Sequence, residues 1–403
     1  MNELELYIHI PFCMKKCNYC DFLSAPADEK SQSAYMEGLK RELVFYGKRL
    51  RGRRISSIYI GGGTPSWLQQ IYIRELMETV YASFFVEDDA EITIECNPGT
   101  LTRNKLECYK NLGINRLSIG LQSADDEELK LLGRVHTYEQ FLRNYELARE
   151  CGFENISLDL MDSLPGHTVE KFYQTLTSVI RLKPEHISCY SLIIEKGTPF
   201  YDWYKFDVVK LYAGMQTEEL PMEDTSYQIG KMTQDVLAEC GYFRYEISNY
   251  AKEGYACRHN IGYWQRKEYL GVGLGASSLL EEVRYSNIRG LRDYIEASLQ
   301  IESKTVYDES LKRTVFSTNL HDNVSGLSRE AQMEEFMFLG FRMPEGIEKS
   351  RFYRKFGFPV SFIYKDVLPK LKQEGLITET PTRLYPTEKG LDLNNYVAAQ
   401  FLL

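Results

Sequence analysis

The sequence predicts an α/β protein built on a parallel sheet, followed by a smaller C-terminal domain. Short strand-like runs alternate with helical stretches from the N-terminus to about residue 195. Glycine and polar residues cluster directly after these runs, and the last seventy or so residues change character. Because parallel strands need crossover helices, the alternation favours a doubly wound sheet or a full or partial barrel.

Six segments qualify as strands, since each is rich in Val, Ile, Tyr or Leu and ends in Gly, Pro or polar turn residues. They are residues 5–10, 55–60, 91–96, 115–120, 155–160 and 186–193. Helices are expected over residues 31–50, 138–153 and 225–242, where apolar side chains recur at helical spacing. Parallel α/β folds place ligands at the carboxyl ends of their strands, so one site assembled from several loops is expected there.

The C-terminal segment reads as helix, helix and short hairpin, over residues 333–343, 362–377 and 383–397. This order resembles a winged-helix module. From residue 329 to 403 the chain carries 11 Lys and Arg against 10 Asp and Glu, so the basic stripe of a DNA reader is missing. A DNA-binding protein with a redox centre is therefore the least favoured hypothesis.

The composition is that of a soluble protein: 403 residues, 43% hydrophobic and 26% charged, with a net charge of −9. This charge argues against a broad nucleic-acid interface. The N-terminus shows neither a basic leader nor an apolar signal core, and a cytoplasmic location is expected. Nine cysteines, six of them scattered singly, do not suggest a disulfide framework.

The other three cysteines, Cys13, Cys17 and Cys20, lie within eight residues at the spacing C-x3-C-x2-C. A structural zinc ion takes four ligands, so this spacing would leave one position empty unless His9 or a distant thiol filled it. A 4Fe-4S cluster has four irons, and three thiolates can hold it while one iron stays free for an outside ligand. The triplet therefore favours a cluster over zinc.

The same spacing after a first strand resembles the signature of the radical S-adenosylmethionine (SAM) superfamily. The resemblance implies a partial (β/α)6 barrel, a 4Fe-4S cluster on the three cysteines and SAM bound to the open iron. In that superfamily a reduced cluster cleaves SAM to a 5′-deoxyadenosyl radical, and the protein positions these groups.

The residues that follow the strands suit SAM, whose amino-acid, ribose and adenine parts need both donors and acceptors. The glycines of "GGGTPS" allow close backbone approach, and the resemblance places Gly62, Gly63 and Thr64 against the methionine part of SAM. Four further candidates supply carboxylates, an amide and a guanidinium: Glu95, Gln122, Arg134 and Asp159. Tyr7 and Tyr19 are expected to shield the cluster or stack on adenine, and Ile193 to line the site.

Nearly the whole chain resembles the oxygen-independent coproporphyrinogen III oxidase group, through "LYIHIPFC", "NRLSIGLQS", "LDLMDSLPG" and the winged-helix-like tail. The oxidase branch carries a fourth cysteine two positions after the third, where this chain has Phe22. The strings "CDF" and "RHNIGYW" instead resemble the haem chaperone branch, HemW. This resemblance implies that haem is bound and delivered to an acceptor protein, for instance a membrane respiratory enzyme. The alternative function is radical decarboxylation of coproporphyrinogen III.

His259 is the candidate ligand of the haem iron, with Asn260, Tyr263 and Trp264 able to orient the ring or pack on the porphyrin. Spacing alone favours a hydrogen-bonded loop histidine, and the resemblance reverses that order. Three domains are predicted: a partial barrel with the cluster loop over 1–200, an extension with the HNxxYW motif over 201–310, and the winged-helix-like domain over 311–403. A homodimer is compatible with the sequence.

Overall fold

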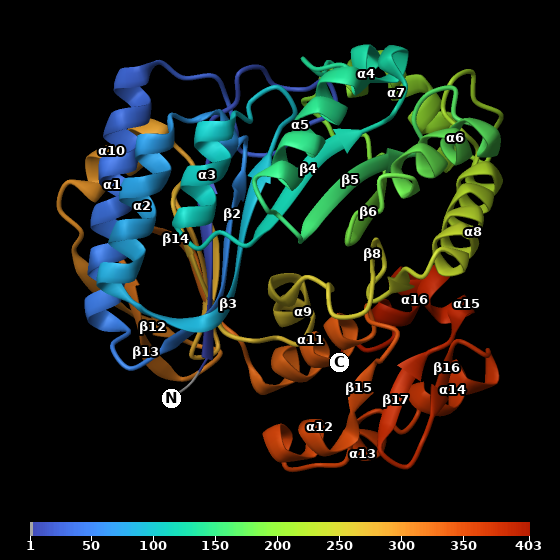
Figure 1. The fold of residues 1–403 in the computed structure, drawn as a ribbon. Coiled ribbons are helices and arrows are strands. Elements are labelled where there is room, and N and C mark those ends of the chain that lie inside the picture. Colours follow the sequence, from blue (N-terminus) through green and yellow to red (C-terminus); the bar gives the residue numbers. More distant parts are fainter. Residues whose placement is uncertain (1–2) are drawn as a thin grey trace.

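The structure is a computed structural model that describes residues 3–403. Its centre is a curved sheet of six parallel strands, at the segments predicted (Figure 1). These strands are β1 (Glu3–Ile10), β2 (Arg54–Gly62), β3 (Phe85–Cys96), β4 (Arg116–Gln122), β5 (Ile156–Asp162) and β6 (His186–Ser191). They pair in sequence order, so the α/β prediction is confirmed. The sheet is extended and open rather than closed.

Crossover helices cover the outer, convex face of this sheet (Figure 1). They are α1 (Glu29–Arg49), α2 (Gln70–Ser83), α3 (Arg103–Asn111), α4 (Asp126–Leu131), α5 (Tyr138–Glu150) and α6 (Val169–Ile180), with the 3-10 turn η1 (Pro65–Trp67). Asp28 caps α1 by accepting from the Ser31 amide, and Thr137 and Gln140 form a capping box at α5. The helices predicted over 31–50 and 138–153 are thereby confirmed.

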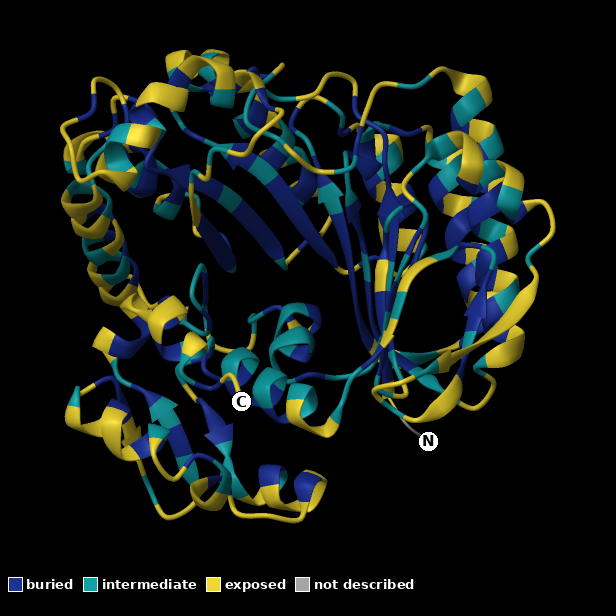
Figure 2. Cartoon of the chain, turned by 180° about the vertical axis from the view of Figure 1, so that it is seen from behind, coloured by how far each residue is buried: buried dark blue, intermediate teal, exposed yellow. Residues whose placement is uncertain are grey.

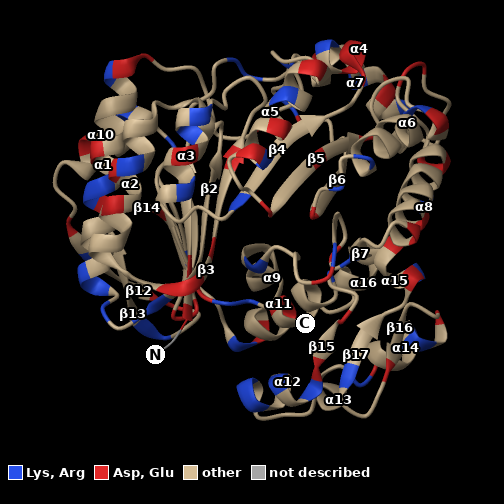
Figure 3. Ribbon diagram, viewed as in Figure 1, with Lys and Arg blue, Asp and Glu red and all other residues tan. Residues whose placement is uncertain are grey.

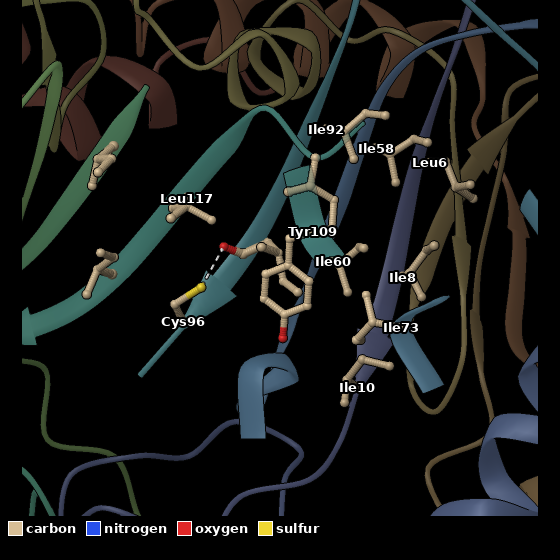
Figure 4. Close-up of a cluster of buried hydrophobic side chains, with 14 of the residues drawn as sticks. Leu6, Ile8, Ile10, Ile58, Ile60, Ile73, Ile92, Cys96, Tyr109 and Leu117 are labelled. Carbon is tan, nitrogen blue, oxygen red and sulfur yellow. Dashed lines mark hydrogen bonds between the residues drawn. The ribbon is translucent and has the colours of Figure 1, made fainter. Parts of the chain in front are cut away.

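Each central strand has an apolar outer face and a polar inner face. In β1, Leu4, Leu6, Ile8 and Ile10 are fully buried, and Figure 4 shows three of them in one cluster with Ile58, Ile60 and Ile73. Successive side chains of a strand point to opposite faces, so Glu5, Tyr7 and His9 point into the concave side. The inner face of the sheet is therefore built to surround something polar, while the outer face holds the core together.

Further strands extend the sheet at both edges, giving the order β14-β11-β10-β9-β1-β2-β3-β4-β5-β6-β8-β7. Their bounds are β7 (Phe243–Arg244), β8 (Asn249–Ala251), β9 (Tyr269–Val272), β10 (Ser277–Leu280), β11 (Val283–Asn287) and β14 (His321–Gly326). A separate hairpin joins β12 (Ser303–Asp308) and β13 (Arg313–Thr318). The helices of this region are α7 (Pro199–Tyr212), α8 (Glu223–Glu239), α9 (Arg258–Trp264) and α10 (Leu291–Ser298). The predicted helix over 225–242 corresponds to α8.

The C-terminal part has its own hydrophobic core, formed around Phe336, Phe352 and Phe401. Its elements are α11 (Arg329–Gly340), β15 (Ile347–Glu348), α12 (Lys349–Phe356), α13 (Val360–Ile363), α14 (Val367–Gln373), β16 (Ile377–Glu379), β17 (Arg383–Pro386), α15 (Glu388–Asp392) and α16 (Asn394–Ala399). The predicted hairpin is formed by β16 and β17, earlier than expected. Thr387 accepts from the Gly390 amide and starts α15, so the chain after Pro386 is helical.

The central strands and the outer surfaces of the helices differ clearly in burial. Figure 2 shows the central strands buried and the outer faces of the helices exposed, and Figure 3 shows both signs of charge mixed over those helices. Within the described chain, none of the helices is both long and apolar enough to cross a membrane. Strand β14 pairs within the large sheet, and the separate C-terminal core begins at Met333. The division of the chain into three domains stays a prediction.

Candidate functional site

A cavity of about 460 Å³ opens on the concave side of the sheet, and the cluster loop after β1 forms part of its wall. Most of the residues predicted for the site line this cavity: Cys13, Cys17, Tyr19, Cys20, Gly62, Gly63, Thr64, Glu95, Gln122, Arg134, Asp159 and Ile193. Residues from β1 to beyond β6 thus meet at one place, because the carboxyl ends of parallel strands share one edge.

Backbone hydrogen bonds hold the cysteine loop in place, both within the loop and to α4 and α7. The Cys13 amide donates to the Ala25 carbonyl at 3.2 Å, and the Asn18 amide donates to the Leu132 carbonyl at 3.0 Å. The Phe200 amide in turn donates to the Asn18 carbonyl at 3.0 Å. These anchors present three thiols on one short loop at the mouth of the cavity.

The surroundings of the thiols suit a cluster of thiolates. A Cβ atom on Gly63 would lie 2.7 Å from the Phe12 carbonyl oxygen and 3.0 Å from Cys13 Sγ, so only glycine leaves this space open. Arg134 Nη1 lies 3.5 Å from Cys17 Sγ and brings a positive charge to the loop. Burial raises the pKa of the Cys20 thiol, so thiolate formation there needs a metal or a positive partner.

A single metal ion fits this arrangement less well. Among residues 3–403, the structure shows no group of three His, Cys, Asp or Glu side chains placed to hold one metal ion. A 4Fe-4S cluster takes each thiolate on a different iron, so its ligands need not converge on one point.

Glu95 lines the cavity and accepts hydrogen bonds from two neighbouring groups. One carboxylate oxygen accepts from the Gly62 amide at 2.9 Å and the other from the Tyr59 hydroxyl at 3.0 Å. Burial raises the pKa of Glu95 to about 7, and the nearby Asp159 carboxylate adds to the increase. Glu95 is therefore a carboxyl group that exchanges a proton near neutral pH and that could accept from a ligand ammonium or hydroxyl.

Gln122 ends β4 in a strained conformation, with φ of 76°. The register of β4 against β5 shifts between Gly120 and Gln122, which turns the Gln122 side chain to the cavity. Left-handed backbone is uncommon for a residue other than glycine and is concentrated at functional sites. Arg134 lies beside this turn, donating to the Gly120 carbonyl at 2.5 Å and to Asn97.

Asp159 lies on β5 and is held by the serines of its neighbours. The Ser118 hydroxyl donates to it at 2.9 Å and the Ser157 hydroxyl at 3.2 Å. Burial raises the pKa of Asp159, and these hydroxyls partly oppose the increase. The exposed Ile193 side chain, 70% accessible, lies at the rim.

Tyr7 does not line this cavity. Its hydroxyl bonds His9 Nδ1 at 2.9 Å, and its ring stacks on Tyr59 at 6.3 Å between centroids. Tyr59 faces the first cavity, whereas Tyr7 and His9 face a second cavity of about 420 Å³. The Tyr59 ring therefore lies between Tyr7 and the predicted SAM site.

His259 is buried and lines neither cavity. Its Nδ1 is bonded to the Ser57 hydroxyl at 2.8 Å and its Nε2 to the Tyr263 hydroxyl at 3.0 Å. Burial lowers the pKa of His259 to about 3, so the ring is neutral at physiological pH. Iron ligation at either nitrogen would replace one of these two bonds, and the assignment of His259 to haem stays a prediction.

The rest of the HNxxYW motif lies between the two cavities. Asn260 lines the first cavity, while Tyr263 and Trp264 line the second together with Tyr269 and Arg284. Helix α9 is thus the floor that separates them, and Figure 1 shows it inside the curve of the sheet. Arg342 lies over the Trp264 ring at 4.2 Å and links this floor to the C-terminal domain.

Sequence reasoning missed several cavity residues that lie inside the strands rather than after them. They are Tyr59, Arg116, Ser118, Ser188 and Tyr190. Each occupies an alternate position in a strand whose other face is apolar, as in "NRLSIG" and "HISCYS". A parallel strand covered by helices on both faces is apolar throughout, so this alternation was the available evidence for a polar interior.

Comparison with known proteins gives two family matches. Residues 7–179 match the Radical SAM superfamily, and residues 327–393 match the HemN C-terminal domain. The chain is similar over its full fold to a solved structure of coproporphyrinogen III oxidase (HemN) from Escherichia coli, described as a radical SAM enzyme. The TM-score is 0.79 at 23% identity, covering 100% of this chain and 90% of that one.

Curated relatives match along almost the whole sequence. The heme chaperone HemW of Bacillus subtilis is 34% identical, with 98% of each chain covered. HemW of Lactococcus lactis is 33% identical, over 98% of this chain and 97% of that one. HemW of Escherichia coli is 37% identical over 74% of this chain and 79% of its own length.

Proposed function

Because this chain belongs to the HemW family of the radical SAM superfamily, we propose that it is a haem chaperone that binds a 4Fe-4S cluster, SAM and haem. The observation that carries the proposal is the shared cavity: the cysteine loop forms one wall, and Asn260 of the HNxxYW helix lines the same space. A haem carrier built on this fold would hold its cofactors and its cargo within one barrel.

Cys13, Cys17 and Cys20 hold the cluster in this proposal, and Arg134 stabilises the thiolate of Cys17. Gly62, Gly63 and Thr64 leave room for the amino-acid part of SAM, and Glu95 accepts from its ammonium group. Gln122 and Asp159 offer an amide and a carboxylate to the ribose and adenine, and Tyr19 covers the loop side. A reduced cluster with SAM supplies radical or electron-transfer chemistry.

Haem is the cargo, and we assign His259 as the ligand of its iron. The ring is neutral, as metal ligation requires, and the Tyr263 hydroxyl that it contacts borders the aromatic second cavity. Ligation then needs a small displacement of α9 that exchanges one hydrogen bond of the ring for iron. Tyr263 and Trp264 supply aromatic surface for the porphyrin.

The acceptor of the haem would be a separate protein, such as a membrane respiratory enzyme, met in the cytoplasm. The described chain has no helix suited to spanning a membrane, so any contact with a membrane enzyme would be through its surface. We expect neither nucleic acid nor a basic groove, given a net charge of −9.

The test is a haem titration of anaerobically reconstituted protein, followed in the Soret band, for the wild type and His259→Ala. The same samples then receive SAM, a reductant and coproporphyrinogen III. We expect stoichiometric haem uptake that His259→Ala weakens, with no porphyrin product. Formation of protoporphyrinogen that depends on Cys17, without haem uptake, would overturn the proposal in favour of the oxidase.

A further inference from the structure

Arg116 is a buried cation without a direct partner. It is the first residue of β4, it lines the first cavity, and only 2% of its surface is exposed. Its Nε is buried without a hydrogen-bond partner, and within residues 3–403 the guanidinium forms no ion pair within 4 Å. Burying a charge without a partner costs folding free energy, so proteins rarely keep such a charge where it has no function.

The carboxylates near Arg116 form no ion pair with it, and each accepts hydrogen bonds from other donors. Glu91 accepts from the backbone amides of Arg258 at 3.0 Å and His259 at 3.2 Å. Glu95 and Asp159 accept from their own amide and hydroxyl donors. These acids reduce the cost of burying the guanidinium through space, yet none occupies its hydrogen-bonding positions.

Two buried histidines flank Arg116, and neither can serve as its counter-ion. His186 is bonded to the Ser157 hydroxyl and to the Tyr245 hydroxyl, both at 2.8 Å, which repeats the Ser and Tyr partners of His259. Burial and the charge of Arg116 lower the pKa values of His186 and His259. The guanidinium is therefore the positive charge at this end of the cavity, whereas Arg134 lies at the cluster end.

The position of Arg116 separates it from the cluster end of the cavity, although Glu95 and Asp159 of the predicted SAM site lie between the two ends. Arg116 and Gln122 are the two ends of β4, and six residues of strand span about 20 Å. The cysteine loop and Arg134 belong to the Gln122 end. Asn260 of the HNxxYW helix lines the cavity with Arg116, so the free guanidinium faces the part of the cavity next to the proposed haem ligand.

We propose that Arg116 binds a propionate carboxylate of the porphyrin cargo inside the barrel. A guanidinium presents parallel N–H donors that match a carboxylate, and a dry site makes such a bond strong. This inference rests on the proposed function, because it assigns an anchoring point to the same haem. Because α9 lies between the two cavities, this geometry requires the displacement of α9 that frees His259 for iron. The porphyrin would then be held at its centre by His259 and at its edge by Arg116.

The test compares haem with haem dimethyl ester, in which both carboxylates are blocked. Each is titrated into full-length reconstituted wild type, Arg116→Lys and Arg116→Met, and the dissociation constants are read from the Soret band. We expect wild type to favour haem over the ester by about tenfold or more, since hydrogen bonds to charged groups have this strength. Arg116→Met should remove that preference, and Arg116→Lys should restore only part of it.

A thermal unfolding experiment separates binding from a structural role. Arg116→Met removes a charge without a partner, so the midpoint should stay the same or rise. The matched control is Arg266→Met, because Arg266 is also buried but is bonded to Glu335 at 2.8 Å and also to Glu282. That variant should unfold at a lower temperature. A marked fall for Arg116→Met would make Arg116 structural and overturn the inference.

Three other outcomes bear on the proposal. Equal binding of haem and its ester by wild type would overturn the inference and leave the proposed function standing. Loss of SAM binding in Arg116→Met, measured by the same titration with SAM, would reassign the guanidinium to SAM and also overturn it. No haem uptake by wild type would refute the proposed function, and the inference with it.

Discussion

His259 Nδ1 of helix α9 lies 2.8 Å from the Ser57 hydroxyl of β2, so the HNxxYW motif is fastened to the inner face of the barrel. The Tyr263 hydroxyl engages the other ring nitrogen at 3.0 Å. Both ring nitrogens of His259 are therefore hydrogen-bonded in this structure, and haem iron must displace one of these bonds to bind the ring.

Ser57→Ala is expected to strengthen haem binding by up to about fivefold, because it removes one hydrogen bond, worth about 1 kcal/mol, that holds His259 in place against the displacement of α9. The same change leaves a buried nitrogen unpaired and should lower stability by about 1–3 kcal/mol. The measurements are a haem titration and urea unfolding. Unchanged or weaker haem affinity in a folded Ser57→Ala protein would argue that His259 does not leave its place.

Serine substitution of Cys13, Cys17 or Cys20 is expected to abolish the stable 4Fe-4S cluster, since each thiolate holds one iron. Cys240→Ser is the matched control, because Cys240 is an exposed cysteine outside the cavity. Iron and sulfide content, with visible absorption, checks the outcome. Full cluster loading in any of the three variants would require a different ligand set.

SAM affinity is expected to rise about tenfold between pH 6 and pH 8 through Glu95. Burial holds the pKa of this carboxyl at about 7 in the free protein, so it is mostly neutral at pH 6 and mostly ionised at pH 8. The ionised form attracts the ammonium group of SAM, and a proton must leave before binding below pH 7.

Isothermal titration of SAM at several pH values measures this dependence. Glu95→Gln should bind SAM more weakly at pH 8 and lose most of the pH dependence. A dependence that persists in Glu95→Gln would belong to another group, Asp159 being the nearest carboxyl with a raised pKa.

Gly262→Ala is expected to destabilise the protein by about 1–3 kcal/mol through overpacking. A Cβ on Gly262 would lie 1.8 Å from Oε1 of Glu5, which is buried on β1. Gly230→Ala is the control, because that helical glycine faces open space and alanine favours helix. Chemical denaturation of both variants checks the difference, and equal stability would mean that Glu5 moves away freely.

The sequence alone was enough for the six central strands, two of the outer helices and the cluster loop. Those features depend on local information: apolar alternation in residues 5–10, helical spacing in residues 31–50, and three cysteines within eight residues. The strand-end residues Glu95 and Gln122 were also predictable, because parallel strands bring their carboxyl ends to one edge. Each of these depends on a rule that relates a short segment to its neighbours.

Only the tertiary structure decided what lies on the floor of the barrel. Ser57 and His259 are 202 positions apart, and Arg116 became notable because three acids near it were bonded to other donors. A single sequence shows which groups are polar but does not show which of them remain without a partner after folding. Which polar groups pair with each other depends on the distances between strands and on how α9 packs against the sheet. Both are properties of the folded molecule.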